Sequence, residues 1–282
     1  MTIRQAIQSA AEMLEAAGVP DPQIDAEWMM EHVCGLDRMQ MRIHQAKELT
    51  TEQEQRFSRL LLSRAKREPV QYLLGEQYFY GLKFRVNPDV LIPRQETEEL
   101  CEWGLKFLQK LDAPTALDLC TGSGAIAITL KHHCPQAAVT ASDLSGKALE
   151  TARANALANA AHVRFVQGDL WEPLEGKRFD LILSNPPYIP TSDCDTLQPE
   201  VMREPRMALD GGADGLDFYR RIASKAEDHL KPGGMIAVEL GVGEAEAVAE
   251  LFRSAGLAEV EIRRDLYGIA RMVGARRRKE HV

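Results

Sequence analysis

The segment Asn185-Pro186-Pro187-Tyr188 combines residue types that could hold a planar substrate group. Two prolines fix φ and remove two donors, so the Asn185 side-chain oxygen and the Pro186 carbonyl remain as acceptors in a rigid turn. Such acceptors suit an NH₂ group, and Tyr188 could pack on the plane that carries it. Gripping both hydrogens of an amide nitrogen would turn its lone pair toward an electrophilic methyl group. The alternative is a proline-rich turn in which Asn185 only caps a strand.

A glycine-rich turn lies upstream, between an apolar run and a helical pattern, in Asp118-Leu-Cys-Thr-Gly-Ser-Gly124. Gly122 and Gly124 lack the Cβ that would keep a ligand from the backbone, and the helix beginning near Ser123 offers free N–H groups. Asp118 could fix this loop or meet a cationic ligand group. Glycine turns also end strands for structural reasons, so the turn by itself does not establish a cofactor.

Two further carboxylates follow the next two apolar runs. Asp143 could accept hydrogen bonds from two ribose hydroxyls. Asp169, in Gly168-Asp-Leu-Trp171, could meet an exocyclic amine while an apolar neighbour covers a flat base. Together with the glycine turn they outline an adenosine. The alternatives are a helix N-cap at Asp143 and a strand-end turn at Asp169.

These groups follow short apolar runs that alternate with helical stretches, which predicts a parallel sheet covered by helices. The expected strands are residues 116–119, 138–142, 163–166, 181–184 and 235–240, with two more after Glu259. Open α/β sheets bind ligands at the carboxyl edge of their strands, where the groups above would gather. We therefore expect one catalytic domain in residues 97–282.

Apolar residues recur at helical intervals before this domain, which predicts a small helical bundle in residues 1–68. Thr50 and Gln53 fit a capping box at the start of its third helix. Residues 69–96 mix aromatic and branched residues with Gly75 and Gly81, which predicts a connecting β-hairpin. Because the bundle carries no visible chemistry, we expect it to dock a protein substrate.

Composition narrows the function classes. The chain has 282 residues, of which 45% are hydrophobic and 27% charged, as in an ordinary globular protein of two domains. Its apolar stretches are too short for a bilayer and its start lacks a signal-peptide core, so we expect a cytoplasmic protein. A formal net charge of −8 disfavours broad phosphate-backbone binding. The basic end, Arg276-Arg277-Arg278-Lys279, could touch RNA, but we expect it to be solvated and frayed.

The sequence gives only weak signals for a metal site or for acid–base catalysis. Five cysteines without a CxxC spacing predict reduced thiols rather than disulfides or zinc ligands. His132-His133-Cys134 lacks further ligands, and neighbouring histidines point to different sides of a helix. A solvated loop is the favoured interpretation of Asp193, Asp195 and Glu200. We expect no metal and no catalytic histidine.

The motifs DLCTGSG, SDLS, GDLW and NPPY, in this order and spacing, resemble the amino- and amide-directed methyltransferases. The resemblance covers about residues 97–276. It implies an α/β, Rossmann-like, seven-stranded class I domain that depends on S-adenosylmethionine. Members that share the NPPY turn methylate adenine amines in DNA, guanine amines in ribosomal RNA or glutamine amides in proteins.

Segments outside the motifs narrow the choice. Pro69-Val-Gln-Tyr-Leu-Leu-Gly75, Val90-Leu-Ile-Pro-Arg-Gln-Glu-Thr-Glu98 and Glu204-Pro-Arg-Met-Ala-Leu209 resemble the peptide chain release factor glutamine methyltransferases, over nearly the whole chain. That family implies N5-methylation of the glutamine in the Gly-Gly-Gln loop of release factors, with S-adenosylhomocysteine as product. We expect a monomer whose partners are release factors, with neither membrane nor direct nucleic-acid binding.

The resemblance, read with the residues themselves, assigns site roles. The catalytic residues would be Asn185, Pro186 and Tyr188, and the substrate would also meet Pro187 and Arg94. The cofactor would bind Asp118, Cys120, Thr121, Gly122, Ser123, Gly124, Asp143, Asp169, Leu170, Trp171 and Asn185. A salt bridge at a helix entry is the alternative role for Arg94.

Two positions depart from the family pattern. Cys120 stands where many relatives have glycine, which is tolerable if this residue need not adopt a positive φ. Leu170 stands where some have tryptophan, which leaves open whether Leu170 or Trp171 covers the adenine.

Three rival functions remain. A glutamine methyltransferase of a ribosomal protein is disfavoured by the segment IPRQETE, which resembles the release factor enzymes. A nucleic-acid amine methyltransferase would need a basic groove. A nicotinamide oxidoreductase or non-catalytic Rossmann module would prefer GxGxxG and would leave NPPY unexplained.

Overall fold

The computed structural model describes residues 1–279, which form two compact units. The first unit comprises Met1–Glu76 together with Gln198–Arg203, and the second comprises Gln77–Leu197 together with the chain from Glu204 onward. The chain therefore crosses between units three times, which the sequence did not predict. Among residues 1–279, no helix has the length and apolar character needed to cross a membrane.

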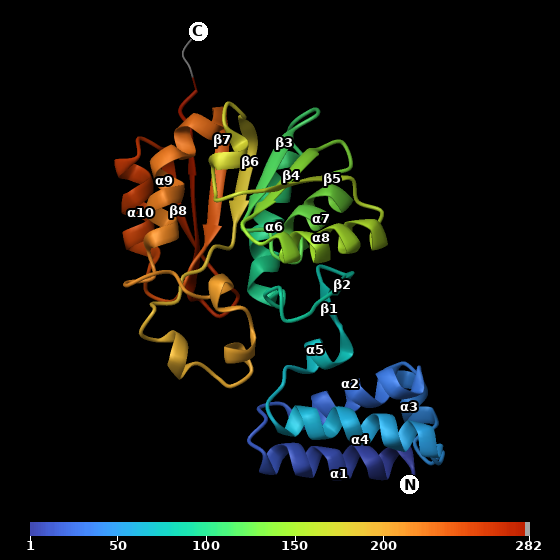
Figure 1. The fold of residues 1–282 in the computed structure, drawn as a ribbon. Helices are drawn as coiled ribbons and strands as arrows, with labels where there is room; N and C mark the ends of the chain where they lie inside the picture. Colours follow the sequence, from blue (N-terminus) through green and yellow to red (C-terminus); the bar gives the residue numbers. More distant parts are fainter. Residues whose placement is uncertain (280–282) are drawn as a thin grey trace. The chain divides into compact units, whose positions relative to one another are not determined.

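The first unit contains a helical bundle, as expected, and extends beyond the expected residues 1–68 (Figure 1). Its helices are α1 (Ile3–Ala16), α2 (Pro22–Cys34), α3 (Arg38–Ile43), α4 (Thr51–Ala65) and α5 (Val70–Leu74). The predicted capping box at α4 is confirmed, since the Gln53 N–H donates to Thr50 Oγ1 at 3.2 Å and the Thr50 N–H to Gln53 Oε1 at 3.0 Å. The short helices α3 and α5 were not expected, because five or six residues show too little periodicity.

A buried ion cluster holds the distant segment Gln198–Arg203 in this unit. Arg64, 4% exposed, donates to Asp25 at 2.7 Å and to Glu200 at 2.8 Å. Arg67 donates twice to Glu200, at 2.6 Å each. Although burial opposes ionisation, these hydrogen bonds hold the pKa of Glu200 below its ordinary value. The expectation of a solvated loop is therefore wrong for Glu200.

The second unit contains the expected sheet, with seven strands in its described part and the order β5-β4-β3-β6-β7-β9-β8. The strands are β3 (Thr115–Leu119), β4 (Ala138–Asp143), β5 (Val163–Gln167), β6 (Phe179–Ser184), β7 (Leu230–Glu239), β8 (Ala258–Arg264) and β9 (Ala270–Arg276). Neighbours from β5 to β7 are parallel, and β9 is antiparallel to both β7 and β8. The predicted fold class is confirmed.

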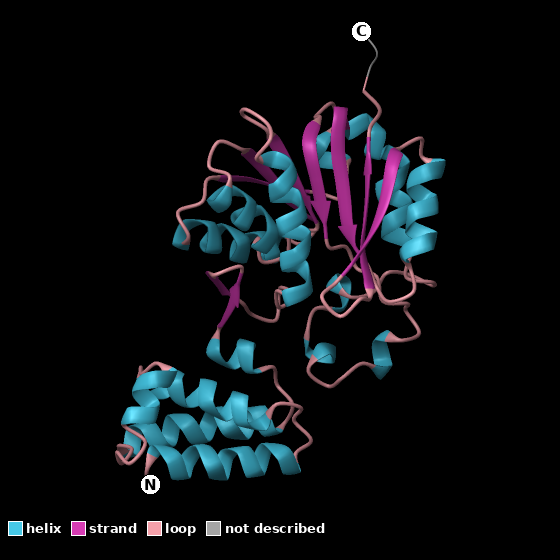
Figure 2. Cartoon of the chain, turned by 180° about the vertical axis from the view of Figure 1, so that it is seen from behind, coloured by secondary structure: helices cyan, strands magenta, loops and turns pink. Residues whose placement is uncertain are grey.

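Helices cover both faces of the sheet (Figures 1 and 2). One apolar core includes side chains of α6 (Gln95–Leu108), α7 (Ala125–His133) and α8 (Gly146–Ala158). The other includes α9 (Asp217–His229) and α10 (Ala245–Ser254). Short 3₁₀ turns are η1 (Glu172–Leu174), η2 (Cys194–Thr196), η3 (Val201–Arg203) and η4 (Arg206–Ala208).

The predicted hairpin is present but shorter than its predicted range of residues 69–96. It consists of β1 (Glu76–Phe79) and β2 (Leu82–Arg85), preceded by α5. Asn155 of α8 fastens it, because the Arg85 N–H donates to Asn155 Oδ1 at 2.7 Å and Asn155 Nδ2 donates back to the Arg85 carbonyl at 3.0 Å. The hairpin is thereby tied to α8 of the second unit.

The basic end is more ordered than expected. Arg276 ends β9, pairs with Glu259 at 3.2 Å and lies 5.0 Å from the centre of the Phe107 ring. Arg277 donates to the Leu230 carbonyl at 2.8 Å. The prediction of a frayed end is therefore wrong at these two residues, and residues 280–282 lie outside the described part of the chain.

Candidate active site

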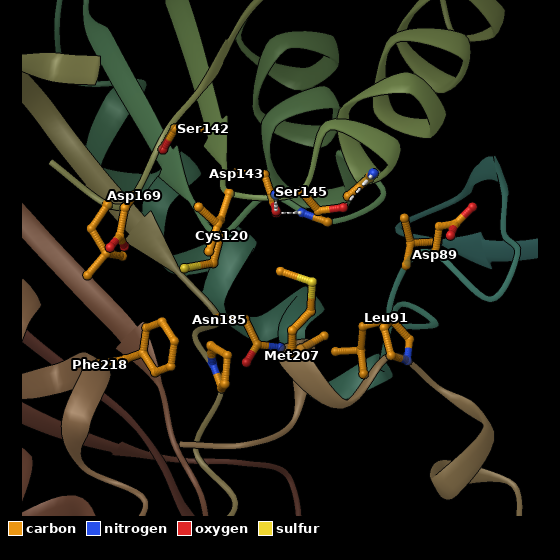
Figure 3. A pocket seen from close by; sticks show the side chains of 18 of the residues that line it. Asp89, Leu91, Cys120, Ser142, Asp143, Ser145, Asp169, Asn185, Met207 and Phe218 are labelled. Carbon is orange, nitrogen blue, oxygen red and sulfur yellow. Dashed lines mark hydrogen bonds between the residues drawn. The ribbon is translucent and has the colours of Figure 1, made fainter. Parts of the chain in front are cut away.

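A pocket of about 730 Å³, solvent at its mouth included, lies at the carboxyl edge of the sheet in the second unit (Figure 3). The chain passes from β3 to β4 and β5 on one side and then returns to β6 on the other side of β3, so the strand order reverses at β3. Such a switch point is where open α/β sheets bind ligands. The lining residues are Asp89, Val90, Leu91, Cys120, Gly122, Ser142, Asp143, Leu144, Ser145, Ala148, Gly168, Asp169, Leu170, Asn185, Pro187, Pro205, Met207, Ala208 and Phe218.

The glycine turn after β3 is left-handed at three positions. The φ angles are 60° at Cys120, 53° at Gly122 and 85° at Gly124. Gly122 lines the pocket, and a Cβ there would meet nothing within 4 Å, so space remains for a ligand. A Cβ on Gly124 would meet Ala152 Cβ of α8 at 3.2 Å, so glycine there allows α8 to pack closely against the turn. A cysteine at position 120 is free of strain only at a negative φ, but Cys120 adopts a positive φ. This backbone conformation costs about 1–2 kcal/mol for a residue with a side chain.

Asp118 fixes this turn through hydrogen bonds to its side chain. Its carboxylate is buried and accepts hydrogen bonds from Thr121 Oγ1 and, at 3.1 Å, from the Ala127 N–H. Burial raises the pKa of Asp118 to about 7. Thr121 and Ser123 also hold the turn, since the Thr121 N–H donates to the Ser142 carbonyl and the Ser123 carbonyl accepts from Asn155. Of the two roles considered for Asp118, the structure shows the loop-fixing one.

Asp143 lies at the end of β4 and lines the pocket. One carboxylate oxygen accepts from the Gly122 N–H and the other from the Ser145 N–H, both at 2.8 Å. Burial raises the pKa of Asp143, while these N–H groups oppose the shift. Helix α8 is capped by Ser145, whose Oγ accepts from the Ala148 N–H. The N-cap alternative for Asp143 is therefore wrong.

The turn after β5 divides its residues between two environments. Asp169 and Leu170 line the pocket, and Leu170 adopts a φ of 48°. Asp169 pairs with Arg221 at 2.7 Å. Trp171 turns away, because its Nε1 donates to the Arg221 carbonyl at 3.1 Å and its ring stacks on His229 at 4.5 Å. Only the first of the two adenine-covering candidates, Leu170, faces this pocket.

The NPPY segment follows β6, whose last residue is fixed to β3 by a hydrogen bond from Ser184 Oγ to the Leu119 carbonyl at 2.8 Å. Asn185 and Pro187 line the pocket, and Pro186 is buried. The Asn185 Nδ2 donates to Thr97 Oγ1 at 3.1 Å. Burial raises the pKa of Tyr188 and keeps the phenol neutral.

Arg94 forms the salt bridge that was the alternative to a substrate role. It precedes α6 and pairs with Glu204, whose side chain is 2% exposed. The second oxygen of Glu204 accepts from the Ile92 N–H at 2.9 Å. Burial raises the pKa of Glu204, and Arg94 opposes the shift.

Several lining residues were missed from the sequence, notably Asp89, Leu91, Met207 and Phe218. Figure 3 shows Phe218 and Asp169 on one side of the pocket, Asp89 and Leu91 on the other, and Met207 between them. Leu91, Met207 and Phe218 are apolar, so they carry no chemical signal that marks them as pocket residues, and the lone carboxylate of Asp89 has no motif around it.

The remaining polar candidates do not form a metal centre. Within residues 1–279, no group of three or more His, Cys, Asp or Glu side chains could hold a metal ion. The rings of His132 and His133 contact each other edge to face at 4.9 Å, rather than pointing to different sides. Asp195 pairs with Arg206 at 2.6 Å and both are exposed, as expected for a solvated loop.

The whole chain is similar to known proteins. The family model described as the PrmC N-terminal domain matches residues 5–75, and the methyltransferase small domain matches residues 104–259. The release factor glutamine methyltransferase of Geobacter sulfurreducens is 45% identical over 98% of this chain and 96% of its own length. That of Moorella thermoacetica is 43% identical over 99% of this chain and 100% of its own length.

A solved structure agrees at the level of the fold. A methyltransferase from Pyrococcus furiosus superposes with a TM-score of 0.53 at 23% identity, covering 71% of this chain and 91% of that one. With near-complete coverage by relatives above 40% identity, the chain belongs to the release factor glutamine methyltransferase family.

Proposed function

We propose that the protein transfers the methyl group of S-adenosylmethionine to the N5 amide nitrogen of the glutamine in the Gly-Gly-Gln loop of release factors. The observation that carries the proposal is the placement of Asn185, a side-chain amide held by Thr97, in a pocket that also contains Gly122 and Asp143. The names of the curated relatives support release factors as the protein substrate.

The residues present fit the cofactor. Gly122 leaves open space beside the backbone, and Asp143 supplies carboxylate oxygens suited to ribose hydroxyls. Leu170 and Phe218 offer apolar surfaces for the adenine, and Asp169 offers a carboxylate for its amine. When bound, S-adenosylmethionine supplies a methyl group activated by a positively charged sulfur.

The chain's own contribution is to hold the target nitrogen. The Asn185 side-chain oxygen and the Pro186 carbonyl accept its two hydrogens, and Tyr188 packs on the amide plane. A nitrogen held in this way would present its lone pair to the methyl group that the cofactor would supply, and the amide proton would pass to water after transfer. Alignment of this kind supplies roughly 7–11 kcal/mol of barrier reduction. A metal and a catalytic histidine are unnecessary in this scheme.

The helical unit serves to dock the release factor, and the enzyme acts as a cytoplasmic monomer without binding nucleic acid directly. A formal net charge of −8 supports this part of the proposal, because phosphate-backbone binding needs clustered cations.

The test is transfer of radiolabelled methyl groups from S-adenosylmethionine to purified release factor. Labelling of the native loop is expected, with none in a release factor whose Gly-Gly-Gln glutamine is alanine. The enzyme variant Asn185→Ala should lose the labelling. Labelling of the glutamine-free loop would place the methyl group elsewhere and reject the proposed target atom. Labelling of a ribosomal protein or of RNA alone would assign the enzyme to another branch.

A further inference from the structure

Two consecutive buried hydrogen bonds connect Asn185 to a carboxylate that the proposed mechanism does not use. Asn185 Nδ2 donates to Thr97 Oγ1 at 3.1 Å, and Thr97 Oγ1 donates to Glu239 Oε2 at 2.6 Å. Thr97 is 5% exposed and Glu239 is 3% exposed. The three residues come from the loop after β6, the first turn of α6 and the end of β7, so three elements converge on one hydroxyl.

The direction of these hydrogen bonds determines which end of the Asn185 amide is free. A threonine hydroxyl has one proton, and an ionised carboxylate can only accept, so that proton goes to Glu239. Thr97 then offers only lone pairs to Asn185, which selects the NH₂ end of the amide. The oxygen of Asn185 is left as the acceptor available to a ligand.

We propose that Thr97 and Glu239 are positioning residues, which fix the Asn185 amide so that its oxygen accepts a hydrogen from the target amide. The inference rests on the proposed function, since it assigns Asn185 the gripping role. Thr97 and Glu239 act through Asn185 and do not themselves touch the substrate.

Stability alone gives little reason for a carboxylate here. A buried carboxylate loses its hydration, and well-packed apolar groups of similar volume are often as stable. The orientation of Asn185, by contrast, requires an acceptor-only group beyond Thr97. An ionised glutamate meets this requirement, while a glutamine side chain could also donate to the hydroxyl.

Protonation of Glu239 would remove the directional constraint. Burial raises its pKa to about 7, while the hydrogen bond from Thr97 opposes the shift. Charged and titratable groups around it are Glu96 and Arg94 at the start of α6, Arg271 of β9, Cys101 of α6, Tyr188 after β6 and Tyr219 of α9. A neutral Glu239 can donate to Thr97, whose own proton can then turn to the Asn185 oxygen. Methyl transfer should therefore fall as the pH drops through about 7.

The experiment compares Thr97→Val, which keeps the shape but removes the hydroxyl, with Thr97→Ser, which keeps the hydroxyl. Thr129→Val is the matched control, because Thr129 is also buried and its Oγ1 has no hydrogen-bond partner among the described residues. Thr97→Val should lower kcat on release factor by about 10- to 100-fold, the loss expected for a misplaced group, with a smaller effect on KM. Thr97→Ser should stay within about threefold of wild type, and Thr129→Val should leave kcat unchanged.

The variant Glu239→Gln tests the direction of the hydrogen bonds between Asn185, Thr97 and Glu239. Its kcat should fall, and the loss of activity expected for wild type as the pH drops from about 8 to about 6 should disappear. A Thr97→Val enzyme with the kcat and pH profile of Thr129→Val would overturn the inference. So would a Thr97→Ser enzyme as impaired as Thr97→Val.

A spectroscopic measurement separates this inference from the proposed function. The ¹⁵N side-chain amide signal of Asn185, assigned by its loss in Asn185→Ala, should shift with pH near 7 in wild type but not in Glu239→Gln. If wild type does not methylate release factor but the signal behaves this way, the function is wrong and the positioning stands. A signal indifferent to Glu239→Gln and to Thr97→Val would reject the positioning.

Discussion

Glu200 and Glu204 lie four residues apart in one loop, yet they bind arginines of different units. Glu200 accepts from Arg64 and Arg67 in the first, helical unit, whereas Glu204 pairs with Arg94 in the second, catalytic unit. Residues 205, 207 and 208, directly after Glu204, line the pocket of the candidate active site. The two carboxylates therefore fix the ends of a short segment that leads into the pocket wall.

Glu200→Ala should destabilise the helical unit by about 3 kcal/mol, because it leaves buried Arg64 and neighbouring Arg67 without this carboxylate. Hydrogen exchange of the α4 amides would measure the loss. Asp195→Asn is the control in the same loop, since it breaks an ion pair with Arg206 in which both side chains are exposed and solvent screens the attraction. Equal protection in the two variants would contradict the prediction.

Arg94→Ala should weaken S-adenosylmethionine binding by about tenfold, because an unpaired buried Glu204 would displace the wall segment that carries Met207. Calorimetric titration with the cofactor would measure the change. A raised KM for release factor with unchanged cofactor affinity would instead favour the substrate role that the sequence suggested for Arg94.

Cys120→Gly should stabilise the catalytic unit by about 0.5–1 kcal/mol, because glycine adopts the φ of 60° without strain. The gain is smaller than the strain removed, because glycine loses more conformational entropy on folding. Cys120→Ala keeps a Cβ and should bring no such gain. The comparison by urea denaturation isolates the backbone effect. A glycine variant no more stable than the alanine variant would show that no strain is stored at this turn.

Leu170→Ala should weaken cofactor binding by about tenfold through lost apolar contact, whereas Trp171→Phe should leave the affinity within about twofold. The reason is that Leu170 lines the pocket while the Trp171 ring stacks on His229. Titration of both variants with the cofactor measures the two affinities. A larger loss of affinity in Trp171→Phe than in Leu170→Ala would indicate that Trp171 covers the adenine.

The free energy of unfolding of the cofactor-free enzyme should fall as the pH rises from about 5 to about 8. Burial raises the pKa of Asp118, Glu239 and Glu244 to about 7 each, so the folded state binds more protons in this range than the unfolded state. His133, whose pKa is lowered by burial, opposes the trend with one proton. Urea denaturation at several pH values gives the slope, and Glu244→Gln should make it shallower. A slope unchanged by Glu244→Gln would contradict the assignment.

The sequence predicts those features that depend on local motifs and on the periodicity of apolar residues. Asp143 and Asn185 are predictable at one sheet edge, because each lies at the end of an apolar run and the carboxyl ends of parallel strands gather there. The hydrogen bond between Thr97 and Glu239 joins residues 142 apart in the chain, and nothing local to either residue predicts it. The left-handed backbone of Cys120 also escaped prediction, since a side chain there gives no local sign of a positive φ.

Residues 198–203 also limit how the molecule can be divided. A chain that begins at Gln77 would keep Glu200 but would lose Arg64 and Arg67, its ion-pair partners. The 3₁₀ turn Val201–Arg203, which follows Glu200 and precedes the pocket wall, would then lose its attachment to the helical bundle. Exchange of helical bundles between two relatives must therefore transplant residues 198–203 together with residues 1–76, because both segments belong to the first unit.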